Sequence, residues 1–79
     1  MRYVTRCATQ SPLAPGFYGP FEFEGGSFRL FRAGPPRDEP PAPYEWWELR
    51  QHFCQPERMA LPRGTTETEA LLRFGFVLR

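Results

Sequence analysis

The stretch from Phe21 to Phe31 reads Phe-Glu-Phe-Glu-Gly-Gly-Ser-Phe-Arg-Leu-Phe. Apolar and polar residues alternate on both sides of a glycine doublet, which is the pattern of a β-hairpin with a tight turn. With Gly25 and Gly26 as the loop, one face of the hairpin is wholly apolar and the other carries an opposite-charge pair. We predict that this hairpin organises the fold. The predicted cross-strand partners are Glu24 with Ser27, Phe23 with Phe28, Glu22 with Arg29 and Phe21 with Leu30.

Two strands and two helices are predicted around the hairpin. Residues 2–8 alternate as a first strand, and residues 76–79 form a short last strand. Residues 44–54 have apolar side chains at helical spacing, and the sequence Thr-Glu-Thr-Glu at 66–69 is a capping box that opens a second helix. Gly75 is placed to end that second helix. The predicted fold is therefore α+β, a small antiparallel sheet in the order β-ββ-α-α-β with two short helices packed on one face.

In the first predicted helix the buried stripe consists of Trp46, Leu49 and Phe53. Trp47 lies on the shoulder of this stripe, and Arg50 falls inside the apolar arc, where it can stack on an indole.

Prolines mark the predicted irregular segments. Pro20 cannot donate a ladder hydrogen bond, so it belongs on a sheet edge or at a bulge. Residues 34–43 hold five prolines and predict an extended connection inside a single domain, residues 1–79. Pro56 is expected to start one helical turn that Pro62 ends, anchored to the core by Met59 or Leu61.

Composition limits the possible functions. The chain has 79 residues, 16% of them aromatic, and a net charge of +1 with acids and bases interspersed. A duplex DNA-binding protein normally carries a clustered basic face, which this sequence lacks. All ten basic residues are arginine, and lysine, asparagine and isoleucine are absent. Their joint absence favours the codon bias of a GC-rich genome over selection for arginine chemistry.

The sequence predicts a cytoplasmic protein without a membrane segment. Its start has no hydrophobic run of the kind found in secretory leaders, and no stretch approaches membrane-spanning length. Cys7 and Cys54 are therefore expected to be thiols, although a single bridge between them stays open.

No catalytic or metal-binding constellation is predicted. On a helix, His52 and Cys54 point apart, so they form neither a nucleophilic pair nor a shared metal site. Glu22 and Glu24 share a strand face, but Arg29 is expected to neutralise Glu22. We predict no cofactor, no metal and no enzymatic activity.

The surplus of aromatic residues indicates a binding function. So small a core cannot absorb every ring, and exposed aromatic and arginine side chains are typical of protein interfaces. We predict a protein-binding protein that acts as an inhibitor, adaptor or regulator of a larger protein. The size of the chain fits a bacterial, phage or mobile-element factor. The alternative that these rings merely cover connections stays open. The predicted binding residues are Arg29, Phe31, Trp47, Arg50 and Tyr18.

Two other functions are considered. Single-stranded nucleic acid can stack on sheet aromatics while arginines hold the phosphates, although the near-zero net charge weighs against it. A free sheet edge can also pair with a second copy of the chain and give a homodimer.

Overall fold

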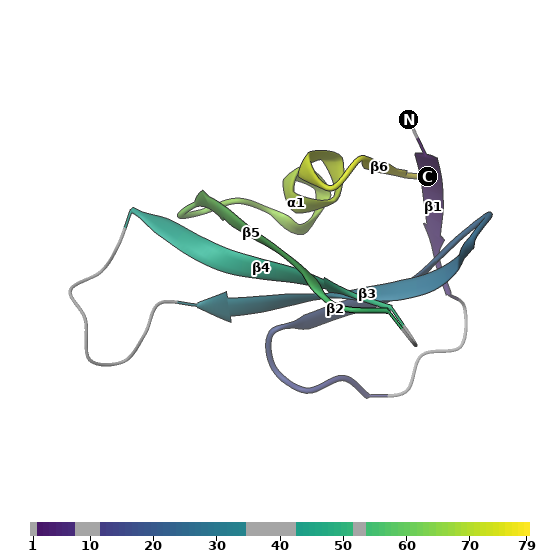
Figure 1. Cartoon of the computed structure of the whole chain (residues 1–79), viewed down its shortest axis with the longest axis horizontal. Coiled ribbons are helices and arrows are strands. Elements are labelled where there is room, and N and C mark those ends of the chain that lie inside the picture. The colour runs from purple at the N-terminus through teal and green to yellow at the C-terminus, as the bar shows by residue number, and fades with distance from the viewer. Residues whose placement is uncertain (1, 8–11, 35–42, 52–53) are drawn as a thin grey trace.

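In the part of the chain that the structure describes, six strands form one curled sheet, and a single short helix lies over one of its faces (Figure 1). The computed structural model describes residues 2–7, 12–34, 43–51 and 54–79. The strand order is β5-β4-β3-β2-β1-β6. The elements are β1 (Arg2–Arg6), β2 (Phe17–Phe23), β3 (Gly26–Gly34), β4 (Tyr44–Arg50), β5 (Glu57–Pro62), α1 (Glu67–Arg73) and β6 (Phe76–Leu78).

The predicted α+β fold with two helices is wrong, because the chain is mostly β. The predicted helix over residues 44–54 is replaced by strand β4, and the predicted helical turn after Pro56 is replaced by strand β5. The sheet is also mixed, since β1 and β6 run parallel while the other neighbouring strands are antiparallel. Tryptophan and tyrosine favour strands, and the neighbouring hairpin offers β4 an edge on which to pair.

The predicted helix start at Thr66 and the last strand are confirmed. The Thr66 hydroxyl oxygen accepts a hydrogen bond from the Glu69 backbone N–H at 3.2 Å, as an N-cap residue does. Gly75 follows the helix with φ +92°, the left-handed backbone that glycine adopts without steric penalty, and leads directly into β6.

The hairpin itself is confirmed, but its register differs from the predicted one. Glu24 and Gly25 form the loop, and Phe23 pairs with Gly26. Moving the loop by one residue moves every partner by two positions, so each side chain keeps its predicted face. The predicted pair of Glu22 with Arg29 is wrong, because Glu22 faces Ser27.

The prediction for Pro20 is confirmed, since a bulge lies at this point of β2. Tyr18 pairs with Leu30 and Phe21 with Phe28, so Gly19 and Pro20 together oppose one residue of β3. The extra residue changes the alternation of side chains along β2. Tyr18 and Phe21 consequently both face the core although they are three positions apart.

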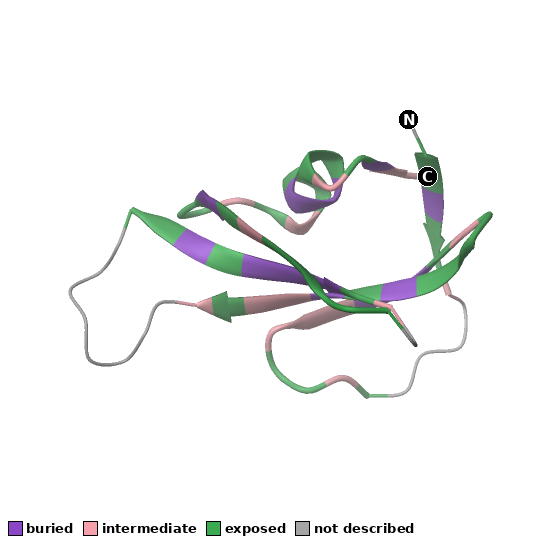
Figure 2. Cartoon of the chain, in the orientation of Figure 1, coloured by how far each residue is buried: buried purple, intermediate pink, exposed green. Residues whose placement is uncertain are grey.

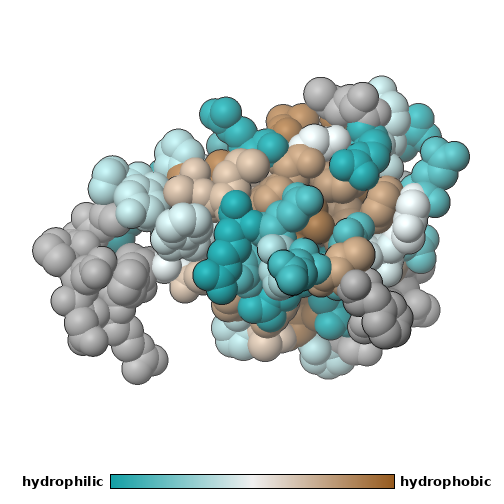
Figure 3. Space-filling model, viewed as in Figure 1, coloured by the Kyte–Doolittle hydropathy of each residue, from teal (hydrophilic) through white to brown (hydrophobic). Residues whose placement is uncertain are grey.

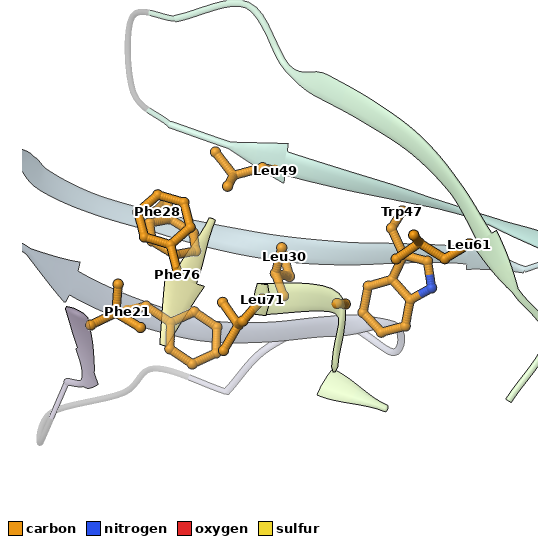
Figure 4. Close-up of a cluster of buried hydrophobic side chains, with 10 residues drawn as sticks. Phe21, Phe28, Leu30, Trp47, Leu49, Leu61, Leu71 and Phe76 are labelled. Carbon is orange, nitrogen blue, oxygen red and sulfur yellow. The ribbon is translucent and has the colours of Figure 1, made fainter. Parts of the chain in front are cut away.

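The core lies between the curled sheet and α1, on what we call the inner face. Buried residues recur along the strands in Figure 2, and Figure 4 shows their side chains gathered into one cluster with Leu71 of the helix and Phe76 of β6. Leu61 anchors β5 in this core, as predicted. The buried hydrophobic residues are Val4, Phe21, Phe28, Leu30, Trp47, Leu49, Leu61, Ala70, Leu71 and Phe76.

Some predictions fall on residues outside the described ranges. These are the placements of His52 and Phe53, the end of the first strand at Ala8, and residues 35–42 of the proline-rich connection. Cys7 and Cys54 are both described, and no disulfide joins them. Among the described residues, no helix has the length and apolar character needed to cross a membrane.

Candidate binding surface

The side of the sheet that faces away from α1, which we call the outer face, carries a row of side chains across four strands. Phe17 of β2 pairs with Phe31 of β3, Phe31 pairs with Glu48 of β4, and Glu48 pairs with Arg58 of β5. The two phenyl rings lie 4.6 Å apart between centroids, at an interplanar angle of 35°. An aromatic pair therefore adjoins a charged pair in one line.

Arg50 joins the aromatic and the charged parts of this row. Its guanidinium carbon lies 4.7 Å from the centroid of the Phe31 ring and 5.2 Å from that of Phe17. The same guanidinium donates from Nε to the Glu48 carboxylate at 2.9 Å, and its Nη2 lies 2.7 Å from the same oxygen. Stacking and ion pairing together hold the Arg50 side chain in one orientation.

Glu48 is a buried carboxylate on this otherwise accessible face, only 4% exposed. Besides Arg50, it accepts a hydrogen bond from Nε of Arg58 at 2.6 Å. Burial alone raises the pKa of Glu48. The hydrogen bonds and charges of the two arginines lower it by more than burial raises it, so the pKa lies below its ordinary value. Glu48 is thus ionised at neutral pH and serves to orient two arginines.

Arg29 stands directly opposite Arg50 on neighbouring strands. Like charges in this position repel each other. Arg29 is exposed and makes no ion pair with any residue in the described part of the chain. The two arginines line an open hollow of about 330 Å³, whose full lining is Phe17, Ser27, Phe28, Arg29, Arg50 and Gln51.

Trp46 and Tyr44 extend the outer face along β4. Both are exposed, and their rings meet edge to face at 6.1 Å between centroids. Trp46 pairs with Gly34 on one side and with Ala60 on the other, and these small neighbours leave the indole uncovered. Trp46, Phe31, Arg50 and Arg58 line a second open hollow, of about 370 Å³. Arg50 lines both hollows, so they lie on either side of one shared side chain.

Polar side chains interrupt the apolar surface elsewhere. In the view of Figure 3, hydrophilic residues are interspersed among the hydrophobic ones on the side of the molecule that is seen. Outside β4, the large apolar residues described as exposed are Tyr3 on β1 and Leu72 on α1. Arginines also lie over aromatic rings elsewhere, as Arg79 does over Tyr3 at 4.6 Å. What sets β4 apart is that two exposed aromatic residues, Tyr44 and Trp46, are in contact with each other.

The predicted binding residues divide between the two faces. Arg29, Phe31 and Arg50 lie together on the outer face. Tyr18 and Trp47 instead face the core, where their rings stack at 5.5 Å between centroids. Trp47 is only 1% exposed, so its predicted place on a helix shoulder is wrong.

An ion pair between Arg32 and the buried Glu45 lies on the inner face beside these two rings. Arg32 donates from Nη2 to the Glu45 carboxylate at 2.9 Å and from Nε to its other oxygen. The hydrogen bond from Arg32 holds the pKa of Glu45 below its ordinary value, against the opposing effect of burial. This pair neutralises a carboxylate that the strand places inside the fold.

The sequence reasoning missed Trp46, Phe17 and Glu48 as members of the outer face. The signal for two of them was weak, because both faces of β4 mix apolar and charged residues, Tyr44, Trp46, Glu48 and Arg50 on one and Glu45, Trp47 and Leu49 on the other. Phe17 had no such signal, since only its pairing with Phe31 places it there.

The described residues offer little for metal or acid–base chemistry. Within the described ranges, no three histidine, cysteine, aspartate or glutamate side chains gather where they could hold a metal ion. Burial, helped by a hydrogen bond to Glu22 and by the charge of Glu22, raises the pKa of the Cys7 thiol. A thiol with a raised pKa is a weak nucleophile at neutral pH.

Gly16 fixes the position of the phenyl pair. It has φ +90°, its carbonyl accepts from the Arg32 backbone N–H at 2.8 Å, and a Cβ here would lie 2.9 Å from the Arg32 carbonyl oxygen and 3.2 Å from the Phe31 ring. We expect Gly16→Ala to lower the free energy of unfolding by about 2–4 kcal/mol, as backbone strain and overlap add. Urea denaturation measures this.

Gly64→Ala is the matched control. Gly64 has φ +88°, but a Cβ added at this position would meet nothing within 4 Å, so only the backbone cost of about 1–2 kcal/mol applies. Equal losses for the two variants would contradict the close approach of Gly16 to Phe31 and Arg32.

Comparisons with protein-family models, with curated proteins and with solved structures found no match to this chain.

Proposed function

We propose that this chain is a non-enzymatic protein-binding module that acts through its outer face as an inhibitor, adaptor or regulator of a larger protein. The observation that carries the proposal is the uncovered Trp46 next to the ordered arginine of the phenyl row. Tryptophan, tyrosine and arginine are the residue types that supply most of the binding energy at protein interfaces. All three lie together here, as Trp46, Tyr44 and Arg50.

The rigidity of this surface supports the same function. Arg50 is stacked and ion-paired before any partner binds, so less side-chain freedom is lost when a complex forms. The strands also present the aromatic rings on a sheet instead of a loop, which keeps their spacing fixed.

The state of the buried carboxylates supports a non-catalytic role. Glu45 and Glu48 both have lowered pKa values, so neither carries a proton to donate at neutral pH. Each is paired with arginine. We further propose action in the cytoplasm, since a reducing compartment suits two cysteines that no disulfide joins. Origin from a phage or mobile element stays a prediction from size alone.

The test compares two exposed apolar side chains on opposite sides of the molecule. Trp46 on the outer face is 43% exposed and Leu72 on α1 is 46% exposed. We expect tagged wild-type protein and the Leu72→Ala variant to capture the same partner from a bacterial lysate, as read by mass spectrometry. Trp46→Ala is expected to weaken that capture at least about tenfold, the size of effect typical of an interface hot spot.

Retained capture by Trp46→Ala together with loss by Leu72→Ala would place the interface on the helix side and overturn the proposal. Capture that is abolished by nuclease treatment would instead favour the single-stranded nucleic-acid alternative. Both variants must keep the circular dichroism spectrum of the wild-type protein.

A further inference from the structure

The hollow between Arg29 and Arg50 has a chemistry of its own. Two arginines, Ser27 and Gln51 line it together with Phe17. No acidic side chain from the described residues contributes to its lining. The hollow therefore presents hydrogen-bond donors and positive charge with no carboxylate of its own to satisfy them.

The surrounding charges leave this part of the face positive. Arg29, Arg50 and Arg58 lie on the outer face of three adjacent strands, and Glu48 is the carboxylate shared by the last two. Glu22 of the neighbouring strand β2 pairs with Ser27 across the hairpin, and its carboxylate accepts a hydrogen bond from the Cys7 thiol. Arg29 makes no ion pair within the described residues and stands opposite a second arginine.

Two arginines directly across a sheet from each other repel and destabilise the pairing of their strands. Within the described residues, Glu48 forms an ion pair with Arg50 but not with Arg29. A bound oxyanion between the two guanidinium groups removes the repulsion and gains charge-assisted hydrogen bonds from both.

We propose that this hollow binds a carboxylate side chain, so that the partner presents an aspartate or glutamate flanked by apolar residues. The carboxylate sits between Arg29 and Arg50, and its apolar neighbours cover Phe31 and Trp46 in the second hollow, which shares Arg50 with the first. This inference rests on the proposed function, because it names the chemistry of the partner for the same surface.

A carboxylate suits the surface better than the phosphates of a nucleic acid. A phosphate backbone is tracked by a continuous basic groove, whereas this chain has a net charge of +1 and one local excess of positive charge. Phe31 and Trp46 in the second hollow also offer apolar surface that an uncharged peptide side chain can cover.

Fluorescence anisotropy with labelled probes tests the inference. The probes are a peptide of alternating glutamate and leucine, the same peptide with glutamine in place of glutamate, and oligo-dT. The wild-type protein is expected to bind the glutamate peptide at least about tenfold more tightly than the glutamine peptide, as one charge-assisted site allows. Arg29→Gln removes this preference, and Arg73→Gln, an exposed arginine on α1, preserves it.

The contrary results are specific. Equal binding of the two peptides, absence of binding to either, or an unchanged preference in Arg29→Gln would overturn the carboxylate site. Tighter binding of oligo-dT than of the glutamate peptide would overturn it in favour of nucleic acid. In partner capture, loss by Trp46→Ala with full retention by Arg29→Gln leaves the proposed function standing and removes this inference, whereas retention by both removes both.

Discussion

Trp47→Ala is expected to lower the free energy of unfolding by about 3–5 kcal/mol, the loss typical of a large aromatic side chain removed from a core. The indole lies at the centre of the inner face, 1% exposed and stacked on Tyr18. A domain of this size has only a few kcal/mol of net stability. The variant is therefore expected to be largely unfolded at 25 °C in circular dichroism and urea titration.

Trp46→Ala is the matched control, because it truncates the same residue type one position away. The Trp46 side chain points to the outer face and is 43% exposed, so we expect a stability change within about 1 kcal/mol. Comparable losses for the two variants would contradict the assignment of residues 44–50 to a strand, since a helix does not place neighbouring residues on opposite faces.

Arg32→Met is expected to lower the free energy of unfolding by about 2–3 kcal/mol at pH 7. The change leaves the Glu45 carboxylate buried without its cation, and breaking a fully buried pair in this way removes about 3–5 kcal/mol. The smaller figure reflects the partial exposure of the Arg32 side chain. The double variant Arg32→Met with Glu45→Met is expected to regain most of the loss, because no unpaired charge remains.

The pH dependence of this pair has a definite sign. The pKa of Glu45 is lower in the folded protein than its ordinary value of 4.5. Its contribution to stability is therefore complete above that ordinary value and is lost as pH falls through the lowered pKa. In Arg32→Met the same carboxylate gains a proton readily, so the deficit relative to wild type is expected to shrink on acidification. A deficit that grows toward low pH would show that Glu45 is not paired with Arg32.

Local signals in the sequence specify part of the fold. The alternation around Gly25, the cap at Thr66 and the glycine at position 75 each determine a neighbouring element through backbone chemistry alone. The predicted loop was Gly25 and Gly26, whereas the observed loop is Glu24 and Gly25. A glycine doublet allows either placement of a two-residue turn. Gly26 takes φ +135° although it belongs to the returning strand, and the sequence does not show whether a glycine with such a backbone lies in the loop or in the strand.

Strand β4 was mistaken for a helix for a physical reason. Trp46, Leu49 and Phe53 have helical spacing, while the alternation at period two is concealed because Glu45 and Glu48, one on each face, are both buried. Burial of a carboxylate depends on an arginine from a neighbouring strand, Arg32 for Glu45 and Arg58 for Glu48. Such tertiary pairs cannot be read from a single segment.

The candidate surface was predictable only in outline. The hairpin pattern placed Arg29 and Phe31 on the outer face, and the structure keeps them there. The contribution of Arg50 follows from pairing between β3 and β4, and that of Phe17 from the bulge at Gly19 and Pro20. Both depend on how strands meet, which composition and spacing leave undetermined.

Hydroxyl-radical footprinting of the chain, alone and in complex with its captured partner, tests the binding surface most directly. The account predicts that oxidation of Trp46 and Tyr44 falls severalfold in the complex, while oxidation of Leu72, which is exposed on α1, stays unchanged. Protection of Leu72 with undiminished oxidation of Trp46 would contradict the claim that the outer face of the sheet is the binding surface.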